Sequence, residues 1–344
     1  MKTLAQEIIE DLDGARICGR TEGHGFSGSA GSGAPWKSAD GAGDCGVQSI
    51  LCRHAVSGKN VRILPVEIIR SSREEAKLRQ EILCGAIERF READGSYPMI
   101  VSRDRWERKR KMMYDRILAH LGVYTQIYAR NCEVRRIDKP TAAAFLENAH
   151  SYGDASCKYR YGLFIKRHTG HLLSEGHTEN LVAPGTLVAV SEFSGARRWK
   201  KGDITVSSYE WVRYASLPSL RISGGMGKML KHFISMVHPD DIMSYADLEW
   251  SEGAVYERLG FVCEGQKAPV EFTFDETTWK RKPSADGADH DRKAAQDETI
   301  GTIKADVPPF KGNDRTSYVA EDGQMLRMVN FGSLKYRLKL TDYR

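Results

Sequence analysis

Hydrophobic residues recur with the spacing of an α-helix in two stretches of the first third of the chain. In the first, Ser71 and Ser72 each stand three residues before a glutamate, a capping pattern that predicts the start of a helix. Its apolar stripe consists of Leu78, Ile82, Leu83, Ile87 and Phe90. A second helix is predicted after Ser102, and runs of branched and aromatic residues at 62–69 and 97–101 predict short strands.

From residue 131 onward, strand-like and helix-like patterns alternate. One helix is predicted to begin at Pro140. Another is predicted where apolar side chains repeat with helical spacing at Met226, Met229, Leu230, Phe233 and Val237. Strands are predicted at 132–137, 159–166, 186–193, 205–215, 242–246, 269–274 and 325–340. This order predicts an α/β (α+β) fold, with a mixed central sheet flanked by helices and a helical N-terminal extension.

Two stretches without periodic hydrophobicity divide the chain. Residues 20–46 are rich in glycine, serine and alanine, the composition of a flexible linker. Residues 281–316 are polar and charged, and we expect a mobile insertion there. The chain is therefore predicted to contain a flexible segment at 1–57, a small α/β or helical module at 58–130, and a main domain at 131–344 that carries the insertion.

Composition and charge argue against several classes of protein, among them membrane-spanning and disulfide-rich proteins. A chain of 344 residues, 41% of them hydrophobic, can bury a sizeable core, yet no run approaches the ~20 apolar residues of a membrane span. The seven cysteines are odd in number and scattered, which argues against a disulfide framework and a zinc finger. The acidic, amphipathic N-terminus is unlike a secretory signal, so we expect a cytoplasmic protein. A formal charge of +5 gives no overall nucleic-acid signature.

The main candidate for chemistry is a glycine-rich loop where a helix begins. Gly224, Gly225 and Gly227 remove side chains at a helix N-terminus, where free backbone N–H groups and the helix dipole favour a negative group. Thirty-two residues after Gly224 comes Tyr256, in the sequence Tyr-Glu-Arg-Leu-Gly-Phe. The pattern predicts an anion-binding loop facing a second helix that carries a phenol.

The glycine loop departs from two other nucleotide-binding motifs. The P-loop pattern fails, because Met229 follows Lys228 and Ile222 stands where its first glycine belongs. A dinucleotide fingerprint lacks its third glycine at Leu230, although Asp247 lies at the distance expected of a ribose-binding acid. A glycine-rich helix entry that binds no ligand is the structural alternative.

Together, these motifs make the stretch from about residue 131 to 275 resemble the acyl-CoA N-acyltransferase core of the GNAT family. Arg221-Ile-Ser-Gly-Gly-Met226 resembles its Arg/Gln-x-x-Gly-x-Gly/Ala loop, with a methionine in place of a small residue, and Tyr256 to Phe261 resembles a later Tyr-x-x-x-Gly-Phe. The chain is also similar in arrangement to acyltransferase-like proteins of phages and mobile elements. The resemblance implies that the pyrophosphate and pantetheine of acyl-CoA are held by Arg221, Ser223, Gly224, Gly225, Met226, Gly227 and Lys228.

The resemblance also implies catalytic roles. Tyr256 would protonate the leaving thiolate, and Glu210 would accept the proton of the amine. Burial beside two aromatic neighbours would raise the pKa of Glu210 toward neutrality. A backbone N–H near Ala215 to Leu217 would stabilise the oxyanion. The alternatives are a core aromatic at Tyr256, a solvent-facing strand residue at Glu210, and a first core residue of the helix at Met226.

Charged and histidine-rich segments offer further candidates. For three histidines between 168 and 177, we expect a polar loop rather than a metal site. Three acids between 247 and 252 can attract a cationic amine or cap the next helix. Seven basic residues face three acids in 103–116, and 197–201 forms a second basic run. Each run is either a solvated surface or a phosphate-binding face.

The sequence therefore predicts an acyl-CoA-dependent N-acyltransferase, with acetyl-CoA as co-substrate, an unidentified amine as acceptor and no metal. A second hypothesis is a nucleic-acid-binding accessory protein of a mobile element, in which 103–116 contacts the backbone and the acyltransferase fold is vestigial. A third is a fold retained for interaction only, with Met226 blocking cofactor entry.

Overall fold

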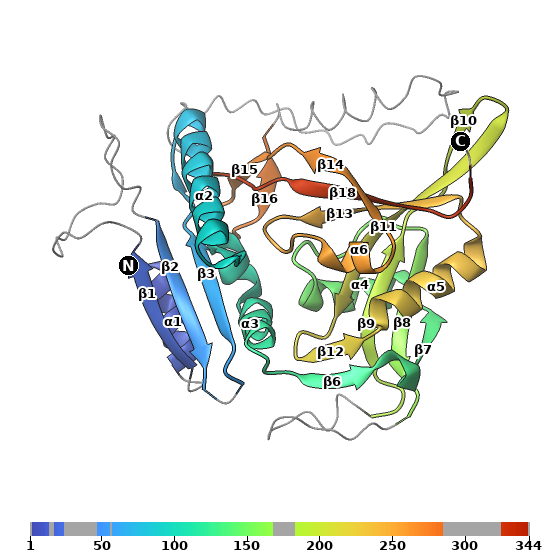
Figure 1. Ribbon diagram of the computed structural model, residues 1–344, viewed down its shortest axis with the longest axis horizontal. Coiled ribbons are helices and arrows are strands. Elements are labelled where there is room, and N and C mark those ends of the chain that lie inside the picture. The colour runs from blue at the N-terminus through green and yellow to red at the C-terminus, as the bar shows by residue number, and fades with distance from the viewer. Residues whose placement is uncertain are drawn as a thin grey trace.

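The computed structural model describes residues 2–13, 17–23, 47–55, 57–167, 183–284 and 325–342, with 17–23 described in the backbone only. Two α/β units lie side by side, the N-terminal one at the left of Figure 1. The mixed α/β class, with sheets flanked by helices, is confirmed. None of the described helices combines the length and apolar character needed to cross a membrane.

A four-stranded sheet in the order β1-β2-β3-β5 forms the N-terminal unit. Its elements are α1 (Leu4–Asp13), β1 (Ile17–Gly23), β2 (Gln48–His54), β3 (Asn60–Val66), α2 (Arg73–Asp94), β5 (Met99–Ser102) and α3 (Arg103–His120). Because successive side chains of a strand point to opposite faces, Ile63 packs with α1 and α3 while Leu64 packs with α2. The predicted cap of α2 is present, since the side chains of Ser72 and Glu75 each accept the other's backbone N–H.

Two elements inside the expected flexible segment 1–57 pack into this unit. Helix α1 buries one helical face, and β2 buries Ile50 and Cys52 in the same core. The spacing of the buried side chains on α1 is that of an amphipathic helix: Leu4, Ala5, Ile8 and Leu12. Most of the glycine-rich tract, residues 24–46, lies outside the described residues. The boundaries at 57 and 130 stay a prediction.

The second unit is built on a large mixed sheet in the order β14-β18-β13-β11-β9-β8-β7, with β10 paired to β11. Its elements are β7 (Cys132–Arg136), α4 (Lys139–Ala149), β8 (Tyr159–Ile165), β9 (Leu187–Phe193), β10 (Arg197–Lys201), β11 (Ile204–Ser216), α5 (Gly225–Val237), β13 (Asp241–Asp247), α6 (Ala254–Arg258), β14 (Val262–Lys267) and β18 (Ser333–Lys339). Strands β7, β8, β9 and β11 are antiparallel neighbours, and α5 then crosses to β13, which is parallel to β11.

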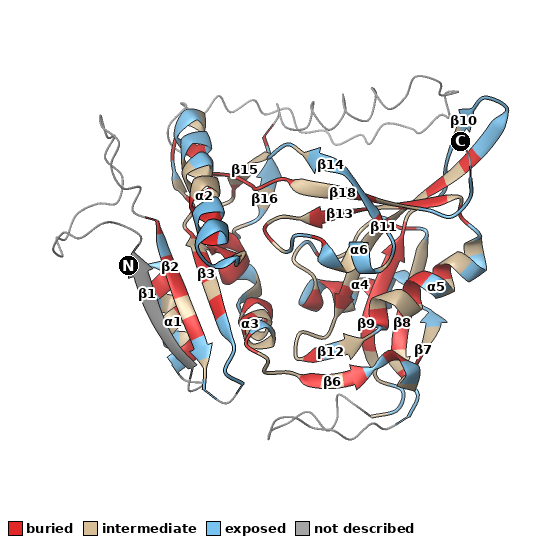
Figure 2. Cartoon of the chain, viewed as in Figure 1, coloured by how far each residue is buried: buried red, intermediate tan, exposed pale blue. Residues whose placement is uncertain are grey.

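Helices α4 and α5 cover opposite faces of this sheet. On one face, Leu146 of α4 packs against Val190 and Ala215. On the other, Phe233 of α5 stacks on Phe193 with ring centroids 3.9 Å apart. Figure 2 shows that β8, β9 and β11 carry much of the buried surface between these layers.

Two small sheets use strands from both halves of the chain. Strand β6 (Thr125–Tyr128) pairs in parallel with β12 (Leu220–Ser223) and is followed by the short helix η1 (Ala129–Asn131). The other sheet has the order β16-β15-β17-β4, formed by Arg281–Pro283, Glu271–Phe274, Leu326–Val329 and Ile69–Arg70. The single strand predicted at 325–340 is thus two strands, β17 and β18, in different sheets. Of the predicted insertion 281–316, residues 285–316 lie outside the described residues.

Candidate functional site

Strands β11 and β13 run parallel but share only a short ladder. Their register pairs residues 208–210 with 241–243. After Glu210, β11 continues in register with β9, and β13 continues in register with β18. The two strands therefore separate toward their C-terminal ends, and backbone groups on their facing edges are left without a ladder partner.

The glycine loop leads into α5 directly after β11 and β12. Gly224 is the N-cap of α5, with φ 78° in the left-handed region that favours glycine. The amides of Gly225, Met226 and Gly227 belong to the first turn, so they have no acceptor within the helix. These donors and the helix dipole make the loop an anion-binding end.

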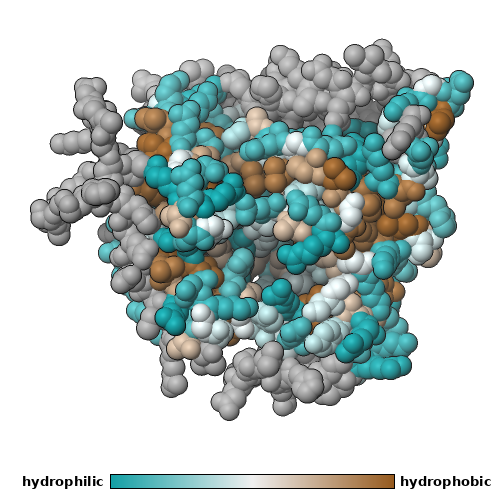
Figure 3. Space-filling model, in the orientation of Figure 1, coloured by the Kyte–Doolittle hydropathy of each residue, from teal (hydrophilic) through white to brown (hydrophobic). Residues whose placement is uncertain are grey.

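Close packing explains the second glycine. A Cβ at Gly225 would lie 2.9 Å from both Ile222 Cγ2 and Tyr214 Oη, which leaves no room for a side chain. At Gly227, a Cβ would lie 3.3 Å from Leu259 Cδ2, just after α6. The loop is therefore held against β11 on one side and α6 on the other. On the face shown in Figure 3, hydrophobic residues gather between α6 and α5.

The polar residues predicted to hold the donor are engaged within the chain. The Arg221 guanidinium donates to Tyr124 Oη at 3.2 Å, and Ser223 Oγ accepts from Gln126 Nε2 at 3.0 Å. The Lys228 ammonium donates to Ala129 O at 2.8 Å and to Cys132 O. Lys228 thus binds the carbonyls of η1 and β7. Ser223 and Gln126 lie on the paired strands β12 and β6, and this pairing was not predicted from the sequence.

Met226 faces the core. It is partly buried and packs against the cluster between α5 and the sheet. This contact agrees with the interpretation of Met226 as the first core residue of the helix, and it leaves the backbone amide as the group that Met226 offers to a ligand.

Tyr256 lies where β11 and β13 separate. Its ring packs edge-on against Trp211 and Phe261 and stacks on Tyr336 at 5.2 Å. Ser244 Oγ is within donating distance of the Tyr256 hydroxyl oxygen at 2.9 Å and of Trp211 O at 2.8 Å. The Ser244 hydroxyl has one proton, so it donates to one of these two oxygens at a time.

Electrostatics couple Tyr256 to Glu210. Burial raises the pKa of the Tyr256 phenol, the negative charge of Glu210 raises it further, and the Ser244 hydrogen bond opposes the rise. Burial also raises the pKa of Glu210, against the positive charges of Arg213, Lys267 and Arg197. The site therefore holds a phenol that stays protonated near neutral pH beside a carboxylate with increased basicity.

Replacing Glu210 with glutamine should stabilise the protein near neutral pH. The pKa of Glu210 is raised in the folded state, so the folded protein binds the proton of this acid more tightly than the unfolded chain does. The free energy of unfolding therefore decreases as pH rises through that pKa. An uncharged amide avoids this loss, so we expect a gain of about 0.5–2 kcal/mol at pH 7. Urea unfolding at pH 4 and pH 7 measures it; a gain that does not grow between the two would contradict the buried-carboxylate account.

The backbone donors predicted at Ala215 and Leu217 face away from the separation. The Leu217 amide donates to Val188 O at 2.9 Å, so it is not available to an oxyanion. Ala215 lies opposite Val190 in the same antiparallel register, and the alternation of such ladders directs its N–H to β9 as well. By the same alternation, the amides of the intervening Tyr214 and Ser216 point toward β13.

The acids near the end of β13 do not form an open cation-binding surface. Asp247 accepts from Arg105 at 2.7 Å, and Glu249 is 1% exposed. Glu249 binds Arg105 and also Arg281, from β16. Glu252 pairs with Arg91 of α2. The charges of Asp247 and Glu249 are paired inside the chain, so the contacts give no support to the alternative in which these two acids attract an amine.

The basic segment 103–116 is also largely neutralised. Arg103 and Arg105 are buried on α3. Four cations of this helix bind acids elsewhere in the chain: Arg103 with Glu7, Arg105 with Asp247, Lys109 with Glu147 and Arg110 with Asp11. Lys111 pairs with Asp115 one turn further along α3. Arg116 lies 3.8 Å over the Trp250 ring. These contacts oppose the prediction of an exposed nucleic-acid-binding face on this helix.

Metal chemistry receives no support from the side chains that can be placed. Within the described ranges, no group of three or more His, Cys, Asp and Glu residues is arranged to hold a metal ion. The histidines predicted to form a polar loop, His168, His171 and His177, lie outside those ranges.

Comparison with protein-family models and with curated proteins gives no match. Among solved structures, the chain is similar to the NatC complex bound to Gag peptide and CoA, with a TM-score of 0.29 and 11% identity over 61% of this chain and 99% of that one. It is similar to the KacTA–DNA complex, with a TM-score of 0.25 and 16% identity over 47% and 99%.

A third similar structure is histone acetyltransferase HPA2 and related acetyltransferase from Corynebacterium glutamicum, with a TM-score of 0.23 and 13% identity over 63% of this chain and 92% of that one. TM-scores this low carry no argument. The order of elements predicted from the sequence is present in the topology: four antiparallel strands, a crossover helix after a glycine loop, a parallel strand that separates, and a short helix with the tyrosine.

Proposed function

We propose that this chain is an acyl-CoA-dependent N-acyltransferase that holds its donor where β11 and β13 separate. The observation that carries the proposal is that the fold offers three groups suited to acyl transfer. They are the free amides of the glycine loop, the phenol of Tyr256, and the carboxyl of Glu210, whose charge raises the pKa of that phenol. Loop amides can bind a pyrophosphate, and the unpaired strand edges can bind the amide groups of pantetheine.

In the proposed reaction, one titratable group accepts a proton and the other donates one. The Glu210 carboxylate accepts a proton from the acceptor amine, and the amine nitrogen bonds to the thioester carbonyl carbon. The oxyanion that forms accepts hydrogen bonds from the amides of Tyr214 and Ser216, which point toward β13. The C–S bond then breaks, and Tyr256 donates its proton to the sulfur. Glu210 and Tyr256 exchange protons with solvent to restore the starting state.

Acetyl-CoA should stabilise the folded protein. A ligand at about 100 times its dissociation constant adds about 2.7 kcal/mol to the free energy of unfolding, which raises the melting temperature by several degrees. S-acetylpantetheine lacks the phosphates, so its effect should be much smaller at equal concentration. Differential scanning fluorimetry with both compounds measures the difference. No shift with millimolar acetyl-CoA, or an equal shift with S-acetylpantetheine, would count against phosphate binding at the loop.

A further inference from the structure

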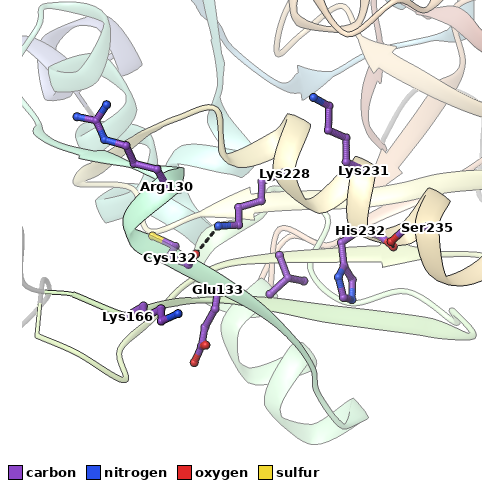
Figure 4. A pocket seen from close by; sticks show the side chains of 9 residues that line it. Arg130, Cys132, Glu133, Lys166, Lys228, Lys231, His232 and Ser235 are labelled. Carbon is purple, nitrogen blue, oxygen red and sulfur yellow. Dashed lines mark hydrogen bonds between the residues drawn. The ribbon is translucent and has the colours of Figure 1, made fainter.

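A basic hollow lies beside α5, and neither proposed catalytic residue borders it. It has a volume of about 540 Å³ and is bordered by η1, β7, the end of β8 and α5. Figure 4 shows Arg130 and Lys166 at one side, and Lys228, Lys231 and His232 projecting from α5 in different directions. Neither Tyr256 nor Glu210 lines it. The hollow therefore shares Lys228 with the glycine loop but is separate from the two proposed catalytic residues.

The positive charges of this hollow are not neutralised by neighbouring acids. Within the part of the chain that is described, Arg130, Lys166 and Lys231 have no carboxylate within ion-pair distance. Lys228 binds only backbone carbonyls there. Glu133 is the one acid of the lining, and it is paired with Arg135. Four cations thus border the hollow without a carboxylate partner among the described residues.

Cations elsewhere in the chain, in contrast, form ion pairs with acids. On α3, Arg103, Arg105 and Arg110 each bind a carboxylate from a distant part of the sequence. Cations gathered in a concave surface repel one another, and the low-dielectric walls concentrate their field. An anion that enters the hollow relieves this repulsion, so the charge pattern favours a ligand with several negative charges.

We infer that the hollow binds the phosphate backbone of a single-stranded nucleic acid. Beside the cations, Tyr128 is 40% exposed and the Arg130 guanidinium lies 4.7 Å over its ring. Proteins that bind single strands combine a basic groove for the backbone with aromatic and guanidinium surfaces on which bases stack. The exposed Tyr128–Arg130 pair next to the hollow supplies that second element, which a site for a small inorganic anion or an acidic peptide does not need.

Fluorescence anisotropy with labelled twelve-residue oligothymidylate and oligouridylate, at sodium chloride from 50 to 300 mM, tests the proposal. Each phosphate contact to a single strand contributes about −0.7 to the slope of log affinity against log salt. Combining Arg130→Gln, Lys166→Gln and Lys231→Gln should therefore weaken binding at least tenfold and make the slope shallower by about 2. Tyr128→Ala should weaken binding about tenfold with little change in slope. Comparing the affinities for oligothymidylate and oligouridylate shows whether DNA or RNA is preferred.

The matched control removes three cations from α3: Arg108→Gln, Arg110→Gln and Lys111→Gln. It lowers the formal charge by the same amount, and its affinity should stay within twofold of the wild type. Both triple variants should keep the rise of the melting temperature with acetyl-CoA. The hollow variant should keep the wild-type melting temperature, and that of the control should fall only slightly, because Arg110 and Lys111 lose surface ion pairs. The proposal is overturned if the wild type does not bind either strand at 50 mM salt, if the control loses as much affinity as the hollow variant, or if a labelled polyglutamate binds as tightly as the oligonucleotides.

Discussion

Arg281→Met should lower the free energy of unfolding by about 3–5 kcal/mol, the cost of breaking a buried ion pair from one side. Arg281 donates to Asp104 Oδ2 at 2.6 Å and to Glu249 Oε2 at 2.8 Å, and both carboxylates are almost completely buried. It also donates to Ser102 Oγ at 3.0 Å. Removing the guanidinium leaves two buried charges short of a partner. Since Asp104 belongs to α3 and Glu249 follows β13, the loss should also weaken the contact between the two units.

Urea unfolding at pH 7 measures this change. Arg108→Met is the control, because Arg108 lies on the exposed side of α3 and no carboxylate pairs with it among the described residues; its effect should stay within about 0.5 kcal/mol. Adding Asp104→Asn to Arg281→Met should recover part of the loss by removing one unpaired charge. An Arg281→Met variant within about 1 kcal/mol of the wild type would show that the network is not the junction between the units.

Tyr256→Phe should lower the turnover number by about 10²–10⁴, the range for a positioned general acid, while the KM for acetyl-CoA changes little. The phenyl ring keeps the contacts with Trp211 and Tyr336, and only the proton donor is lost. Thiol release from acetyl-CoA measures the rate, with the acceptor that gives the fastest turnover in a panel of primary amines.

The pH profile adds a second readout. The acid must be protonated, so the wild-type rate should fall as pH rises through the raised pKa of Tyr256, and this limb should vanish in Tyr256→Phe. Tyr336→Phe is the matched control, because the Tyr336 hydroxyl binds Glu252 O at 3.2 Å and has no role in the proposed proton transfer. Turnover of Tyr256→Phe equal to that of Tyr336→Phe would remove Tyr256 from the mechanism.

The sequence predicted those features of the fold that depend on residues close together in the chain. The capping box at Ser72, the apolar face of α5 and the glycine loop all depend on residues within about one or two helical turns. The candidate roles of Glu210 and Tyr256 came from the family resemblance, and the structure adds the electrostatic effect of Glu210 on the Tyr256 phenol.

Features that depend on distant partners could not be read from the sequence. The basic run 103–116 suggested an exposed surface, but its cations bind acids from residue 7 to residue 247, and no local signal marks such pairs. The parallel ladder of β6 and β12 joins residues about ninety-five positions apart. Ser244 was missed because an isolated serine in a strand has no motif; its role follows only from its position where β11 and β13 separate.

The most direct measurement is a titration of the ¹⁵N-labelled, deuterated protein with CoA, followed by amide chemical shifts in nuclear magnetic resonance spectra. The account predicts that the amides of Gly224, Gly225 and Gly227 shift together with those of Tyr214 and Ser216, because the ligand contacts the loop and the facing edge of β11. The amides of Lys231 and Ser235, beside the basic hollow, should move little. Saturable shifts confined to the hollow, or unchanged glycine amides at millimolar CoA, would contradict the proposed donor site.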